Sequence, residues 1–315
     1  MTLDNFFARS PKLVWEEEQA RLKAAEEQKR LDELRKALAA KRQGKKTDEK
    51  VTPPPHVPPA PMVGAGFSIE VLPDCYRLNG VLLRDGVRTI DLKNELLLNG
   101  ESKKQDDWVL FKKNAGQNDF VPADAPTYHS VCAALYDNRD NAQYHDVIEQ
   151  ARQFLAAQFS AHWLMTLSRA NYSPQSAQSI GQRVKNAIKR KIQTTLDEVI
   201  HDYGSAKPAV APVALVGSQD YLSKIPDAST YCEAVVGDKD ATHVTAVYKW
   251  ITGKDAYAWR RTSSPDQNID ARAVVLGVKS NDDAFYLSAF GSLDYGWPAL
   301  GVRSAQKNST GNGGQ

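Results

Sequence analysis

The chain has 315 residues, of which 42% are hydrophobic and 25% are charged, and its formal net charge is +2. This length suffices for about two domains with appendages, and the near-neutral balance excludes a polyelectrolyte partner for the chain as a whole. The three cysteines, Cys75, Cys132 and Cys232, are too far apart for a disulfide framework or a zinc site, so we expect buried thiols in a reducing compartment.

The sequence contains no apolar run of about 18 residues and no N-terminal signal pattern. We therefore expect a cytoplasmic protein without a membrane span. Export by another route would still allow display on a surface or a virion.

Residues 1–50 are predicted to form a helical segment, in which Leu31, Leu34 and Leu38 keep the spacing of a coiled-coil seam. The seam is short, so two interpretations stay open: an oligomerising or docking helix, and a solvated single helix with an apolar tip. Residues 51–65 follow as a Pro-rich linker. Their TPPPHVPPAP stretch predicts a semi-rigid polyproline-II spacer, with a ligand for a partner module as the alternative.

Residues 66–206 are predicted to form a central α+β module. Its first part is strand-like, with alternation in residues 67–71, an Asn79-Gly80 turn signal inside the run 76–83, and a short apolar run at 108–111. Helical spacing then appears in residues 128–136 and 146–159. We expect these helices to cover one side of a sheet.

Four potential metal ligands lie in this module: His129, Cys132, His145 and His162. A structural zinc site needs four ligands at paired close spacings, and here only His129 and Cys132 are near one another. Hydrogen-bonded core histidines are the expected outcome, so we predict no metal and no cofactor. No acid, base or nucleophile has a partner at a telling spacing, so we also predict that the protein is not an enzyme.

A basic helix is predicted at residues 176–200. Its apolar positions recur every four residues, while Arg183, Lys185, Lys189, Arg190 and Lys191 crowd the other surface. Such a helix could bind a phosphate backbone, which makes a nucleic-acid-associated protein the alternative function. The other interpretation is that these basic residues form an ordinary solvent-exposed face of the helix, because the acidic residues Asp197 and Glu198 follow at once.

Residues 207–306 are predicted to form a C-terminal domain, followed by a flexible tail at 307–315. A helix is expected at 241–252, ended by Gly253, and the run 274–287 reads as a β-hairpin. The irregular segment 288–297 is too aromatic for an ordinary solvent loop. A short apolar strand closes the domain.

This domain resembles a known family. The WRRTSSP motif at residues 259–265, the hairpin, the irregular loop and the terminal LGVR at 300–303 are similar to the end of C-type-lectin-like domains related to the formylglycine-generating-enzyme fold. More narrowly, they resemble the variable proteins of diversity-generating retroelements. The resemblance implies a lectin-like domain with a twisted antiparallel sheet. The enzymes of that fold use cysteines in this region, and no cysteine follows Cys232 here, which argues against the enzyme branch.

The resemblance also implies which residues face a ligand. Carried over, the display positions are Asn281, Asp283, Phe285, Ser288, Phe290, Ser292, Asp294, Tyr295 and Trp297. Such residue types are common in binding loops, although each aromatic among them would equally suit a small core. Tyr286 and Leu287 are assigned to the core.

The sequence thus predicts an α+β protein with an N-terminal helix, a Pro-rich linker, a central module and a C-terminal lectin-like domain. That domain would present a diversifiable surface to an unidentified protein or glycan, and the N-terminal helix would allow oligomerisation.

Overall fold

The computed structural model describes residues 66–174, 197–213, 215–265, 268–279 and 283–304. The chain divides into two units, Met1–Ala60 and Pro61–Gln315, and the described residues all belong to the second. The predicted N-terminal helix, the Pro-rich linker, most of the basic helix, Asn281 and the C-terminal tail lie outside the described residues.

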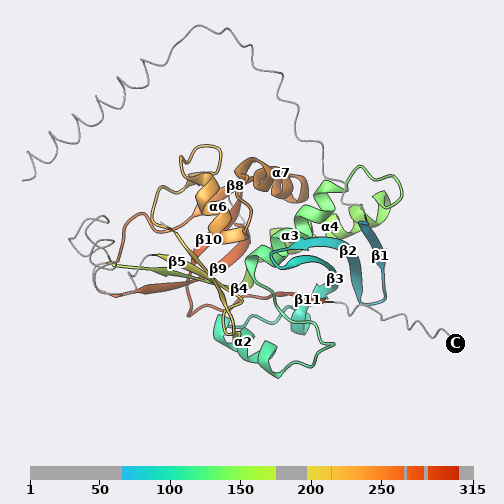
Figure 1. Ribbon diagram of the computed structural model, residues 1–315, viewed down its shortest axis with the longest axis horizontal. Coiled ribbons are helices and arrows are strands. Elements are labelled where there is room, and N and C mark those ends of the chain that lie inside the picture. Colours follow the sequence, from blue (N-terminus) through green and yellow to red (C-terminus); the bar gives the residue numbers. More distant parts are fainter. Residues whose placement is uncertain (1–65, 175–196, 214, 266–267, 280–282, 305–315) are drawn as a thin grey trace, which may run out of the picture. The chain divides into compact units, whose positions relative to one another are not determined.

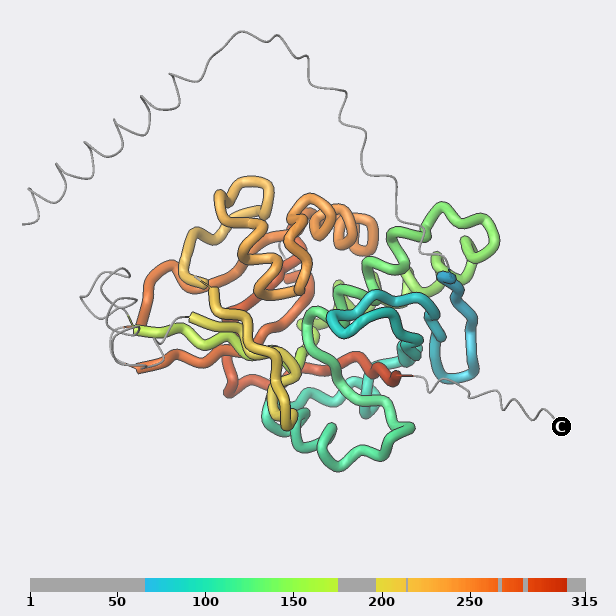
Figure 2. The backbone as a smooth tube through the Cα atoms, viewed as in Figure 1, coloured from blue at the N-terminus to red at the C-terminus, as the bar shows by residue number. Residues whose placement is uncertain are grey.

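The described part of the chain is an α+β structure with two sheets (Figure 1). The smaller sheet has the strand order β1-β2-β3-β11 and is antiparallel throughout. Its strands are β1 (Ser68–Val71), β2 (Cys75–Leu83), β3 (Gly86–Leu96) and β11 (Leu300–Ser304). Figure 2 shows the red C-terminal strand lying next to the cyan strands, so the last strand of the chain completes the first sheet.

The larger sheet has seven strands in the order β6-β5-β4-β9-β10-β8-β7. They are β4 (Leu164–Tyr172), β5 (Glu198–His201), β6 (Ala209–Pro212), β7 (Asp220–Tyr221), β8 (Asp255–Trp259), β9 (Asp270–Val278) and β10 (Ala284–Gly291). The β9–β10 hairpin is confirmed. Strand β10 lies between β9 and β8; it is antiparallel to β9 and parallel to β8. The sheet is therefore mixed, and the prediction of an antiparallel sheet is wrong at this pair.

Five α-helices and one 3-10 helix accompany the sheets in the described residues. They are η1 (Leu97–Gly100), α2 (Gln105–Asn114), α3 (Ala125–Asp137), α4 (His145–Ala161), α6 (Ala228–Val236) and α7 (Ala241–Thr252). The helices predicted at 128–136, 146–159 and 241–252 are confirmed, and Gly253 ends α7 in a left-handed conformation, as a helix-terminal glycine commonly does.

The main core lies between the helices and both sheets, since α3 also contacts β2 and α4 contacts β1 and β3 of the smaller sheet. Helices α3, α4 and α7 contact strands β8, β9 and β10 on one face of the larger sheet, and α7 also contacts α3, α4 and α6. Phe285 from β10 stacks on Tyr248 from α7 with ring centroids 4.1 Å apart. A smaller core lies on the opposite face, where Trp108 of α2 packs with Met165, Leu167 and Val275.

In both sheets, strands that precede residue 207 in the sequence pair with strands that follow it. Strand β5 pairs with β6, β4 pairs with β9, and β3 pairs with β11. The boundary that we placed between residues 206 and 207 therefore falls inside the seven-stranded sheet. Hydrophobic pattern alone did not show this, because it says which residues are buried and not which strand lies beside which.

Three local predictions were wrong. The Asn79-Gly80 pair forms an irregularity inside the long strand β2 and not a turn; Gly80 has a φ of 78°, and a Cβ there would lie 3.1 Å from Phe67 Cα. Residues 108–111 belong to helix α2, since a run this short does not distinguish helix from strand. The last residues of the predicted basic helix, Glu198 to Ile200, are part of strand β5.

Among the described residues, none of the helices has the length and apolar character needed to cross a bilayer.

Candidate functional site

Strand β8 divides its side chains between two different surroundings. Its sequence DAYAW alternates between buried and half-buried positions, because successive side chains of a strand point to opposite faces of the sheet. Ala256 and Ala258 belong to the main core beneath helix α7. Tyr257 and Trp259 therefore stand on the other face.

The register of the neighbouring strand brings a third ring to this face. Tyr286 of β10 is paired with Tyr257 of β8, and its ring centroid lies 5.0 Å from those of both Tyr257 and Trp259. Tyr221 of β7 contacts Tyr257 at 5.4 Å, and Trp163, just before β4, contacts Tyr286 at 5.5 Å and Trp259 at 5.8 Å. We call these five side chains the aromatic face. Tilted and edge-to-face rings at such separations attract one another.

A glycine allows the Trp163 segment to cross this face. Gly277 of β9 is paired with Tyr286, and a Cβ at Gly277 would lie 2.6 Å from the carbonyl oxygen of His162. No real side chain tolerates that separation from a backbone atom. Gly277 therefore permits the close approach of backbone that places Trp163 against Tyr286.

Four rings of the aromatic face are half-buried, and the fifth, Tyr286, is buried at 7% exposure. Tyr221, Tyr257, Trp259 and Tyr286 are absent from both clusters of buried apolar residues, and Trp163 only packs against the edge of the smaller one. Helix α2 lies on this side of the sheet but contacts β4, and α6 and α7 lie on the other side (Figure 1). Within the described residues, no helix covers the aromatic rings of β7, β8 and β10.

Charged side chains of both signs surround the aromatic face, and Lys279 lies 5.5 Å from the centre of the Trp259 ring. Lys224 lies 5.0 Å from the ring of Tyr221 and pairs with Asp220 at 3.6 Å. Lys254, just before β8, pairs with Asp283, just before β10, at 2.6 Å. The rim thus offers both signs of charge beside an apolar centre, which is the usual composition of a recognition surface.

The loop between β10 and β11 is held firmly beside this face. The main chain of Trp297 exchanges hydrogen bonds with that of Lys103, at 3.1 and 3.2 Å. The indole nitrogen of Trp108 donates to the Trp297 carbonyl at 2.9 Å, and Met165 donates to the Pro298 carbonyl at 2.8 Å. Both Trp297 and Trp163 pack against the smaller core, so the loop adjoins the aromatic face.

The predicted display positions separate into two groups. Tyr295 is 67% exposed and meets Trp297 edge-to-face with centroids 6.1 Å apart. Asp294 and Asp283 are also exposed, and Ser292 and Trp297 are half-buried. These residues remain available for contact with a ligand.

The other display positions lie inside or beneath the surface. Phe285 and Ser288 are buried, so their assignment to a water-facing surface is corrected. Phe285 fails because it occupies the helix-facing side of β10, as Leu287 does. Phe290 is half-buried against the main core, edge-to-face with Tyr172 at 6.2 Å. Tyr286 and Leu287 are buried as predicted.

Sequence reasoning missed most of the aromatic face. The signal was present in the DAYAW sequence of β8, where alanine alternates with large aromatics. Small residues facing a helix and aromatics facing away define two different sides of one strand.

The two residues of the Trp-Arg pair in the WRRTSSP motif, Trp259 and Arg260, lie in different surroundings. Trp259 lies on the aromatic face, whereas Arg260 is fully buried. The Arg260 guanidinium donates to both carboxylate oxygens of Asp227, at 2.7 and 2.8 Å, and to the Ser218 carbonyl at 3.0 Å. Arg260 is thus a structural residue behind the face.

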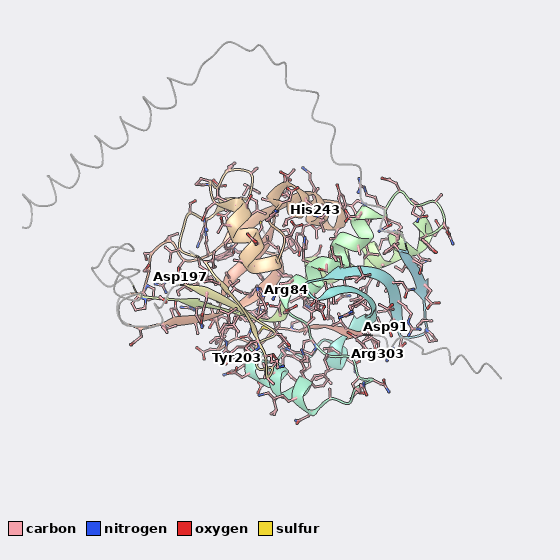
Figure 3. All side chains as sticks on the ribbon, in the orientation of Figure 1. Arg84, Asp91, Asp197, Tyr203, His243 and Arg303 are labelled. Atoms are coloured by element: carbon pink, nitrogen blue, oxygen red, sulfur yellow. The ribbon has the colours of Figure 1, made fainter. Side chains whose placement is uncertain are left out.

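A second feature is a pocket of about 570 Å³ between α2, β3 and β11. Its charged lining residues already have partners in the protein. Lys112 pairs with Asp202 at 2.5 Å, and Asp124 caps helix α3 through the Thr127 amide at 3.0 Å. Arg303 binds the buried Asp91 at 2.7 Å, and Figure 3 labels both residues at this edge of the sheet. The charged side chains named here are therefore already neutralised or hydrogen-bonded within the protein.

A serine–histidine contact occurs inside the protein. Ser168 Oγ lies 2.9 Å from His201 Nδ1, and His201 Nε2 lies 2.9 Å from the Ala234 carbonyl. Burial lowers the pKa of His201 to about 4, so the ring is neutral. Both residues are buried, and Ser168 Oγ also accepts from the Ala125 amide at 3.0 Å. A substrate cannot reach this hydroxyl, so the contact is structural.

The four metal ligands considered from the sequence do not converge. Cys132 is buried, and burial raises the pKa of its thiol to about 12. His145 is exposed beside Asp146. His129 instead lies with Asp238 and His243, two residues that sequence reasoning did not single out, and these three side chains could hold a metal ion.

No protein-family model matches this chain, and no curated protein or solved structure matches it either.

Proposed function

We propose that this protein is a ligand-binding module that recognises a protein or glycan partner through the aromatic face and the adjoining Tyr295 loop, without chemistry on the ligand. One observation carries the proposal: five aromatic side chains contact one another on a face of the large sheet that no described helix covers.

Binding would depend on aromatic contact area that is already ordered in the free protein. Tyrosine and tryptophan supply a large contact surface with few rotatable bonds, so ordering them on binding costs little entropy. Here the rings already constrain one another, and Trp163 and Trp259 each touch Tyr286. Aromatic residues at the centre of an interface also carry much of its binding energy. The charged rim would set orientation and specificity.

The resemblance to C-type-lectin-like display proteins supports the same conclusion. A firm frame with an exposed aromatic loop just before the last strand is what that resemblance implies, and Tyr295 and Asp294 have this position and exposure. We propose accordingly that the C-terminal segment is a lectin-like display region. A neighbouring reverse-transcriptase gene, with a near-copy of the final coding segment differing mainly at adenines, would test its diversification.

The charge distribution favours a partner that is not a polyanion. Binding to a phosphate backbone needs an excess of cations, whereas Lys224 and Lys254 at the rim each pair with a carboxylate. The alternative function through the basic helix depends on residues 175–196, which lie outside the described part of the chain.

The experiment compares two tryptophan variants. A glycan array and a surface-display protein library would be screened with the full chain, and the affinity of any ligand would be measured for each variant. Trp259→Ser removes a half-buried tryptophan of the aromatic face, which contacts both Trp163 and Tyr286. Trp250→Ser is the matched control, since Trp250 is also half-buried but lies on helix α7 at the other side of the sheet.

We expect Trp259→Ser to weaken binding about 30-fold or more, because a central aromatic contributes about 2 kcal/mol or more. Tyr295→Ala should weaken it less, and Trp250→Ser should leave it unchanged. Binding that survives both Trp259→Ser and Tyr295→Ala, or that a single-stranded oligonucleotide competes away, would refute the proposal.

A further inference from the structure

Three side chains from distant parts of the sequence meet between helices α3 and α7. His129 lies in the middle of α3. Helix α6 ends at Val236, Gly237 follows in a left-handed conformation, and Asp238 comes next. His243 lies in the first turn of α7, where Figure 3 labels it. The short turn between α6 and α7 thus brings Asp238 and His243 to the buried His129.

The three side chains converge on one point. Asp238 Oδ2 lies 3.2 Å from His129 Nε2 and 2.7 Å from His243 Nδ1. In a tetrahedral zinc site with bonds of about 2.0–2.1 Å, neighbouring ligand atoms are separated by about 3.3 Å. The 3.2 Å separation is close to that value and the 2.7 Å separation is shorter, and all three ligand atoms lie within 4.8 Å of one another. Side-chain rotation that lengthens the Asp238–His243 contact would complete a ligand set around a small ion.

Two of the three groups are oriented by further partners. His243 Nε2 lies 3.1 Å from Asp137 Oδ1 at the end of α3, and the backbone amide of Asp240 donates to Asp238 Oδ1 at 2.8 Å. A carboxylate on the far nitrogen of a histidine is the usual second partner of a metal-bound imidazole, because it fixes the ring and raises its basicity. The free oxygen and nitrogen atoms are thereby directed at the common point.

The surroundings favour a cation. His129 is 3% exposed, so its Nε2 atom meets Asp238 away from bulk water. Asp238 and Asp137 bring two carboxylates to the cluster, whose oxygens lie 2.7 and 3.1 Å from the two ring nitrogens of His243. The local charge therefore attracts a proton or a metal ion to the same place.

We infer that His129 Nε2, Asp238 Oδ2 and His243 Nδ1 form a binding site for a divalent transition-metal ion, with zinc as the ion that best suits two imidazoles and a carboxylate. Asp137 is a positioning residue for His243. Because Asp238 and His243 are partly exposed, a solvent molecule would take the fourth coordination position. The ion would join α3 to the α6–α7 turn.

The test uses the full chain without a histidine tag, stripped with a chelator. Zinc binding would be measured by competition with a chromogenic chelator and by elemental analysis, and thermal unfolding would be followed with zinc, magnesium or no added ion. The variants are His243→Gln, Asp137→Asn and, as the matched control, His145→Gln. His145 is an exposed histidine whose only described partner is Asp146.

We expect one zinc ion per chain, a higher unfolding temperature with zinc than with magnesium, and no change in His145→Gln. His243→Gln should lose more than about 100-fold in zinc affinity, and Asp137→Asn about 10- to 100-fold, which is typical when the group that orients a metal-binding histidine is removed. If His243→Gln does not fold, the Asp137→Asn result decides. The inference would be overturned if the wild type bound no zinc, or if Asp137→Asn bound zinc as tightly as the wild type. The cluster would then be a network of hydrogen bonds and ion pairs without a metal ion.

Discussion

The buried pair between Arg260 and Asp227 makes an asymmetric prediction about stability. Arg260 is fully buried, whereas the Asp227 side chain is 38% exposed. Replacing Asp227 by Ala leaves a guanidinium without its counter-charge inside the protein, which typically costs about 3–5 kcal/mol. Replacing Arg260 by Met leaves a carboxylate that water can reach, so the loss is limited to hydrogen bonds and packing, about 1–2 kcal/mol.

The assay is urea unfolding of each variant and of the double variant, followed by far-ultraviolet circular dichroism. We expect Asp227→Ala to lose about 2 kcal/mol more than Arg260→Met, and the double variant to be close to Arg260→Met. An unfolding free energy for Arg260→Met that is equal to or lower than that of Asp227→Ala would refute the reasoning. The cost would then come from the lost contacts of Arg260 with Ser218 and Tyr231 and not from a stranded charge.

Two further predictions concern the cores and acid stability. Phe285→Ala should cost about 3–5 kcal/mol in unfolding free energy, because Phe285 is buried and stacked on Tyr248; a loss below about 1 kcal/mol would place the ring outside the core. Burial alone would raise the pKa of Asp91, but hydrogen bonds from Arg77 and Arg303 outweigh it and hold the pKa below its usual value. The stability that the Asp91 ion pairs contribute is therefore present above about pH 4 and is lost as the pH falls further. The unfolding free energies of the wild type and Asp91→Asn should accordingly converge at low pH. A difference between them that stays constant with pH would contradict the ion pairs.

Several local elements of the fold follow from short stretches of sequence. The 3.6-residue spacing predicted α3, α4 and α7, and Gly253 marked the end of α7. The β-branched run after Arg272 and the following aromatic run predicted the β9–β10 hairpin. These features depend on neighbours a few residues away, so periodicity and capping suffice to find them.

Both candidate sites depend on contacts between residues that are far apart in the sequence. The aromatic face exists because β10 inserts beside β8 and sets Tyr286 against Tyr257, and the same insertion turns Phe285 into the core. His129 meets His243 because α7 packs on α3. The last strand pairs with β3 across more than half the chain. Strand order and helix packing depend on which apolar surfaces cover one another, and that choice is made by the whole fold and leaves no local pattern in the sequence.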